Sequence, residues 1–145
     1  MFRLKILFIL ILLPAAIYAQ CDSEPFLDNC TAVIGNNFNF LKTYKFRTTN
    51  EEQTGEKKIY GYSYVFSKGS TYVLTSCYDD SDGNKMIVSL YDSNRKLITS
   101  TMDRKTGKLY PLIQFNCSST GVYYFTFNFQ REEGGCGVSI LGFKK

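Results

Sequence analysis

The residue types that usually carry enzyme chemistry are sparse in this chain. The sequence contains no histidine, so the most common general base is missing. It also lacks the G-x-S-x-G motif that presents a serine nucleophile. Two acidic pairs occur, Asp79 with Asp80 and Glu132 with Glu133, but both fall in expected turns, where solvated carboxylates are common. We therefore expect a protein that is not an enzyme and that holds no cofactor.

One acidic turn has the oxygen spacing of a cation site. Asp80, Asp82 and Asn84 stand at alternate positions, and Ca²⁺ prefers several such carboxylate and amide oxygens. The segment does not fit an EF-hand loop, because Tyr78 occupies the first ligand place and no glutamate follows at the twelfth. We interpret the segment as an ordinary acidic turn without a metal, and calcium binding is the alternative.

Tyrosine side chains could supply a flat platform for a ligand, because each ring has an apolar body and a polar tip. The candidates are Tyr62, Tyr64, Tyr91 and Tyr124. Sugar-binding modules of the sandwich type use such aromatic faces, although this chain has no tryptophan. The alternative is that half of these rings belong to the core or to a sheet edge.

The five cysteines are Cys21, Cys30, Cys77, Cys117 and Cys136, and in an exported chain they predict disulfides. Their odd number leaves a thiol unpaired, which could link two chains as a dimer. Cys77 and Cys117 each end an expected strand, so we predict a bridge between them at one rim of the fold. Two of the other three would form the second bridge. The alternative is that Cys136 takes one of this pair and the N-terminal arm takes the other.

The first nineteen residues have the order of a secretory signal peptide. Arg3 and Lys5 precede an apolar run at 7–13, and small residues lead to Ala19. The run is shorter than the roughly 20 apolar residues of a transmembrane span. We therefore expect cleavage after Ala19 and an exported protein, periplasmic or extracellular. An uncleaved anchor and a lipoprotein cut before Cys21 are the alternatives.

The expected mature chain, residues 20–145, shows no second apolar segment and no linker, which indicates one domain. An N-terminal arm and a first strand occupy 20–58, and the rest of the domain occupies 59–145. Without Arg3 and Lys5, fifteen basic residues face thirteen acidic ones, a net charge of +2. This balance gives no reason to expect a nucleic-acid partner.

Alternating patterns at regular intervals predict an all-β protein. The clearest covers 121–130, where four rings, from Tyr123 to Phe129, occupy every second position. The other strands are expected at 38–47, 59–67, 71–78, 85–91, 96–101, 109–117 and 136–143. We see no amphipathic helix, and 21–37 reads as an irregular arm. About eight short strands of this spacing indicate an antiparallel β-sandwich, jelly-roll-like, with a barrel as the alternative.

Three segments resemble the bacterial pre-peptidase C-terminal domain. They are KGSTYVLT (68–75), MIVSLYDSNRKLITS (86–100) and STGVYYFTF (119–127). The family has a glycine turn into a strand, an apolar strand that ends in Leu-Tyr-Asp, and a later strand that opens with Gly-x-Tyr-Tyr. The resemblance covers about 60–141 and implies a small antiparallel β-sandwich, usually an accessory module beside a secreted protease. Here the module stands alone, and its composition is similar to small exported proteins of Bacteroidetes-type bacteria.

These observations favour an exported, non-catalytic β-sandwich that binds a protein or glycan partner or stabilises an envelope assembly. A carbohydrate-binding module that uses the four candidate tyrosines is the first alternative. A hydrolase is the second alternative, and it would need an open cleft lined by carboxylates.

The signal-peptide pattern makes a prediction about the mature N-terminus. We expect the exported protein to begin at Gln20, or at its cyclised form, because the small residues before it suit the signal peptidase. Intact-mass measurement of the exported protein checks this expectation. A mature chain that begins at Met1, or at a lipid-modified Cys21, would contradict it.

Overall fold

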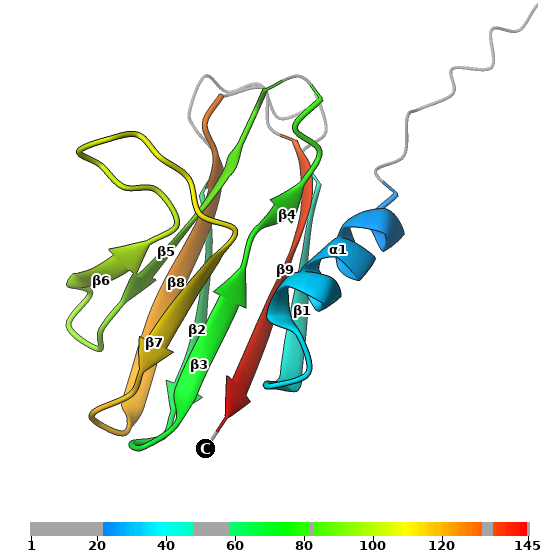
Figure 1. Cartoon of the computed structure of the whole chain (residues 1–145). Coiled ribbons are helices and arrows are strands. Elements are labelled where there is room, and N and C mark those ends of the chain that lie inside the picture. The colour runs from blue at the N-terminus through cyan, green and yellow to red at the C-terminus, as the bar shows by residue number, and fades with distance from the viewer. Residues whose placement is uncertain (1–21, 48–58, 82, 132–134, 145) are drawn as a thin grey trace, which may run out of the picture.

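The computed structural model of the protein describes residues 22–47, 59–81, 83–131 and 135–144 (Figure 1). In chain order, the elements are α1 (Glu24–Ile34), β1 (Asn39–Arg47), β2 (Tyr60–Phe66), β3 (Thr71–Thr75), β4 (Cys77–Tyr78), β5 (Met86–Tyr91), β6 (Leu97–Ser100), β7 (Leu112–Asn116), β8 (Gly121–Phe129) and β9 (Cys136–Lys144). All strand pairs are antiparallel. The predicted all-β class is therefore confirmed.

The strands form two packed sheets. The first sheet has the order β1-β9-β3-β7, with β4 also paired to β9, and the second has the order β2-β8-β5-β6. β3 and β4 keep one register against β9, from Leu74 opposite Leu141 to Cys77 opposite Val138, so they form one interrupted strand. If β3 and β4 count as one strand and the strands are renumbered from 1 to 8 along the chain, the two sheets have the orders 1-8-3-6 and 2-7-4-5. These are the strand orders of a jelly roll, which is built from two Greek keys. The jelly-roll-like sandwich is confirmed, and the barrel alternative is wrong.

The expected strands lie where the alternating patterns place them. Their bounds differ from the observed ones by at most three residues. The largest difference is in β7, which begins at Leu112 rather than at Leu109. Leu109 instead forms an isolated bridge with Met102, and Pro111, which has no backbone N–H, separates that bridge from the strand.

The expectation of an irregular arm at 21–37 is wrong, because α1 fills most of it. Pro25 lies in the first turn, where a missing N–H costs no helical hydrogen bond, and Gly35 ends the helix with a φ of 66°. Phe26, Leu27, Cys30 and Ile34 recur at helical spacing and turn toward one side. The sequence predicted a loop here because the segment contains a proline and two cysteines.

The core lies between the two sheets and is mainly aromatic. The rings of β8 at Tyr123, Phe125, Phe127 and Phe129 are buried, while the alternate residues face the other side. Phe46 of β1 lies with its ring centre 4.4 Å from that of Phe127, which joins the first sheet to the second. The predicted orientation of the β8 stripe is therefore correct.

The contrast between the two faces of β8 predicts different costs of truncation. Phe127→Ala should lower the free energy of unfolding by about 3–5 kcal/mol, because it leaves a cavity in the core. Asn128→Ala, on the outer face of the same strand, should cost about 1 kcal/mol or less. Urea unfolding of the two variants measures both values, and equal losses would contradict the assignment of faces.

Candidate functional site

Helix α1 covers part of the outer face of the first sheet (Figure 1). Phe26, Leu27 and Ile34 of the helix pack with Ile140 of β9 in a small cluster separate from the main core. Gly142 lets the helix approach, since a Cβ there would lie 2.9 Å from Cδ1 of Ile34. This part of the surface is therefore closed by the protein itself.

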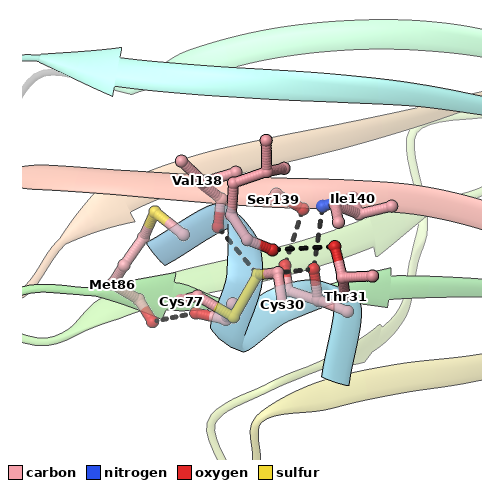
Figure 2. Close-up of a disulfide and its surroundings, with 10 residues drawn as sticks. Cys30, Thr31, Cys77, Met86, Val138, Ser139 and Ile140 are labelled. Carbon is pink, nitrogen blue, oxygen red and sulfur yellow. Dashed lines mark hydrogen bonds between the residues drawn. A yellow bond between two sulfur atoms is a disulfide. The ribbon is translucent and has the colours of Figure 1, made fainter. Parts of the chain in front are cut away.

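A disulfide between Cys30 and Cys77 attaches α1 to this sheet (Figure 2). Their Cα atoms are 5.7 Å apart, and the bridge closes a sequence separation of 47 residues. It lies beside the interruption between β3 and β4. There the Thr75 hydroxyl accepts the Ile140 N–H at 2.8 Å and donates to Sγ of Cys30 at 3.0 Å. The Ser139 hydroxyl donates to the Thr75 carbonyl at 2.6 Å, so side chains satisfy backbone groups at the break.

The predicted Cys77–Cys117 bridge is wrong. Each cysteine ends a strand in sequence, but antiparallel neighbours end at opposite rims. Cys117 exchanges backbone hydrogen bonds with residues 69 and 70, at the start of β3, whereas Cys77 lies beyond its end. Cys77 lies seven positions after Ser70, about 23 Å along a strand, and a disulfide needs Cα atoms within about 7 Å. Cys77 also faces α1, while Cys117 belongs to the main core.

Cys117 is the free cysteine of the described residues, and its side chain is only 4% exposed. Its thiol donates to the Ser119 carbonyl at 3.1 Å, and the Tyr123 hydroxyl donates to the same oxygen at 2.8 Å. Burial, followed by the adjacent thiol, raises the pKa of Tyr123 to about 12. A buried, hydrogen-bonded thiol is structural, so the structure gives no support to a disulfide-linked dimer through this residue.

Cys136 is also disulfide-bonded. With Cys30 and Cys77 joined, the predicted second bridge reduces to a pairing of Cys136 with Cys21. Cys21 lies outside the described residues, so this pairing stays a prediction.

The structure describes two of the three candidate ligands of the acidic turn, Asp80 and Asn84. Asn84 is buried, and its Oδ1 accepts the Arg131 N–H at 2.9 Å, which ties the turn to the end of β8. Asp80 is exposed, and Asp82 lies outside the described residues. Nowhere in the described part of the chain do three or more His, Cys, Asp or Glu side chains form a possible metal group. The absence of a calcium site stays a prediction.

Of the two acidic pairs, the structure describes Asp79 and Asp80, and Asp79 is held as a carboxylate. The carboxylate of Asp79 accepts the Ser81 N–H at 2.9 Å, and the Ser81 hydroxyl and N–H lower the pKa of this exposed aspartate. A carboxyl group held ionised in this way suits a turn rather than proton donation at neutral pH. Glu132 and Glu133 lie outside the described residues.

The four candidate tyrosines do not share one face. Tyr62 and Tyr64 lie opposite Phe125 and Tyr123 of β8 on the inner side of the second sheet, where they pack against the core. Only Tyr91 and Tyr124, which are directly opposite each other on β5 and β8, face outward together. The alternative that half of the rings belong to the core is therefore correct.

An exposed outer patch surrounds this second pair. We define it by Ser63, Val65, Tyr91, Arg95, Val122 and Tyr124. Val65 is 57% exposed and Val122 is 39% exposed, and these residues lie opposite each other on β2 and β8. Together with Ser63 and Tyr64, they line a shallow hollow. Apolar side chains exposed beside tyrosine and arginine are typical of interaction surfaces.

The turn between β5 and β6 positions the cation of the outer patch. The carboxylate of Asp92 accepts the N–H groups of Asn94 and Lys96, each at 2.9 Å, and Arg95 between them has a φ of 64°. The guanidinium carbon of Arg95 lies 3.7 Å from the ring centre of Tyr124. The sequence interpretation missed this arginine. A signal for the patch was present, because Val65 and Val122 are apolar residues at positions that alternate with the inward aromatic rings.

Comparisons with known proteins leave the family open. No protein-family model matches the chain, and no curated protein matches it either. Among the described residues, no helix has the length and apolar character needed to cross a membrane. The fold and the outer patch are the features of the described residues that bear on function.

The cysteine geometry predicts the result of peptide mapping. Digestion without reductant should release a linked pair of peptides containing Cys30 and Cys77, and Cys117 should react with a thiol reagent only after unfolding. Cys30→Ser should lower the free energy of unfolding by about 4 kcal/mol, the loop-closure entropy of a loop of this length. A linked peptide joining Cys117 to Cys77 would contradict the structure, and Cys117→Ala is the control that should leave the linked pair intact.

Proposed function

We propose that the protein is an exported, non-catalytic β-sandwich module, similar to the pre-peptidase C-terminal domain, which binds a partner protein through the outer patch. One observation carries the proposal. α1 covers part of the outer face of the first sheet, whereas the β2–β8 side of the second presents Val65 and Val122 to solvent. Exposed apolar side chains of this kind gain free energy when a partner covers them.

The composition of the outer patch favours a protein over a sugar. Tyrosine and arginine are, with tryptophan, the residues enriched among those that dominate protein interfaces. A sugar would stack on an open ring face, but the guanidinium of Arg95 already occupies one face of Tyr124. Among the described residues, no cation lies over Tyr91, so it is the one outward ring of the predicted platform that is left open to a sugar. The carbohydrate-binding function therefore remains the second candidate.

The positions of the resembling segments support the family proposal. Residues 68–75 contain β3, residues 86–100 contain β5 and β6, and residues 119–127 cover most of β8. These strands include one of the two central strands of the first sheet, β3, and both central strands of the second, β8 and β5. The antiparallel sandwich agrees with the fold that the resemblance implies. α1 precedes the resembling region in the chain, and the Cys30–Cys77 bridge attaches it to the sandwich. Both would therefore be additions to the shared fold.

Export is supported by the cysteines as well as by the N-terminal pattern. A disulfide buried under a helix persists in an oxidising compartment and is rare in the cytosol. The non-catalytic character is supported by the exposed, ionised Asp79 and by the structural thiol of Cys117, neither of which is prepared for catalysis.

The outer patch can be tested by truncating its central pair. Arg95→Ala and Tyr124→Ala should each weaken binding of a partner isolated from envelope extract by about 2 kcal/mol, roughly thirty-fold in affinity, as for interface residues that dominate binding. Gln114→Ala, on the exposed face of β7, is the matched control and should leave the affinity unchanged. Surface plasmon resonance against the isolated partner measures all three values.

Two outcomes would contradict this function. Equal affinity of wild type and both patch variants would remove the outer patch from the interaction. Binding on a glycan array that is lost in Tyr124→Ala, with no captured protein, would support the carbohydrate-binding candidate instead.

A further inference from the structure

Among the described strands, four form the edges of the two sheets, and three of these are protected against pairing with another chain. Exposed edges present unpaired N–H and C=O groups, and proteins block them with lysines, prolines, bulges or short strands. β1 carries Lys42 and Lys45 and has a register shift between Phe40 and Lys42. β7 has five residues and directly follows Pro111, and β6 has four residues with a shift in its pairing to β5.

The fourth edge, β2, has none of these features. Its seven residues, YGYSYVF, include no charged residue and no proline. It pairs with β8 in one unbroken register, from Tyr60 opposite Phe127 to Phe66 opposite Gly121. Among the described strands, β8 is its only sheet neighbour, so its other side is an edge. A regular, uncharged strand of this length is a template for another strand.

We propose that β2 pairs in antiparallel orientation with β2 of a second copy of the chain, about a two-fold axis at Ser63. The two four-stranded second sheets would then form one continuous sheet of eight strands. A two-fold pairing uses the same edge on both copies and leaves the short β6 strands at the two ends of the joined sheet, so the assembly closes as a dimer. This inference is independent of the identity of any partner that binds the outer patch.

The sequence of β2 is self-complementary about this axis. On the outer face, Ser63 meets Ser63 of the second copy, and each Val65 meets a Gly61. Val65 is 57% exposed, and nothing lies within 4 Å of the position of a Cβ at Gly61, so the valine has space beside the glycine. On the inner face, Tyr62 meets Tyr64, and aromatic cross-strand pairs stabilise a sheet.

Lysines on β1, the edge strand of the first sheet, restrict the proposed strand pairing to the second sheet. β1 lies on the same side of the sandwich as β2, as shown by the 4.7 Å between the ring centres of Tyr44 and Tyr62. A pairing of β1 centred on Lys42 would place this charge opposite its equivalent in a second copy, and like charges opposite each other destabilise strand pairs. Lys45 of the same strand is ion-paired with Glu24 of α1 at 3.2 Å, so a second chain along this edge would meet the helix pair as well. The uncharged edge of β2 therefore fits a second copy, and that of β1 does not.

Opposite charges at Ser63 give a direct test. The exported wild-type protein should sediment as a dimer at micromolar concentration. Ser63→Arg and Ser63→Glu should each weaken the dimer by about fivefold, because each places like charges directly across the axis. An equal mixture of the two variants should contain more than the statistical half of heterodimer, which native mass spectrometry resolves by the mass difference between Arg and Glu. Gln114→Arg, which adds the same charge to the exposed face of β7, should leave the dimer unchanged.

Three results would overturn the proposal. The first is a wild-type protein that stays monomeric throughout the micromolar range. The second is a dimer that Gln114→Arg weakens as much as Ser63→Arg does. The third is a purely statistical heterodimer fraction in the mixture. An excess of heterodimer, in contrast, also shows that both variants are folded, since only folded edges can pair.

Discussion

The burial of one aromatic stripe organises this protein. Phe125 and Phe127 of β8 pack against Tyr44 and Phe46 of β1, and Tyr123 packs against Phe66 of β2. Because side chains alternate along a strand, burial of these rings forces Val122 and Tyr124 to the outer face. The outer patch is therefore a direct consequence of the core, and a slip of one residue in β8 would remove both together.

The outer faces of the two sheets differ in how they are kept compatible with water. Val138 and Ile140 of β9 point outward and are apolar, so this part of the first sheet needs a cover. α1 provides it, but an isolated helix of 11 residues is marginal in water. Packing beside Gly142 and the bridge from Cys30 to Cys77 hold it in place. On the second sheet, Ser63, Thr126 and Asn128 make much of the outer face polar enough to meet water without a helix.

The sequence predicted the strands well because each depends on a local pattern. Alternation located β2 and β8, and turn residues separated the strands, so eight strands of a jelly roll could be expected. The helix was missed because 11 residues with a proline and a cysteine give a weak periodic signal. Tyr62 and Tyr64 were predicted as exposed rings, although they share one strand phase with Phe66 in the sequence, and the structure shows Phe66 fully buried on that face.

The disulfide and the candidate site depend on information that no local pattern contains. Whether Cys77 and Cys117 can meet depends on the direction of β3 relative to β7, and this direction is a property of the topology. The stacking of Arg95 on Tyr124 likewise joins a turn to a strand about thirty residues away, and it requires the pairing of β5 with β8. Residues that neighbour each other only through the sheet order could be found from the sequence only after that order was known.

The edge of β2 connects the core to the proposed dimer. Its inner residues must be aromatic because they complete the main core, and Gly61, Ser63 and Val65 remain to face outward. A lysine at Ser63 would protect the edge as Lys42 and Lys45 protect β1, and the core would not oppose it, because Ser63 is exposed. The lack of a charge at this position is therefore not imposed by folding. It is consistent with a strand that is kept free to pair, with the outer patches of two copies brought into one continuous surface.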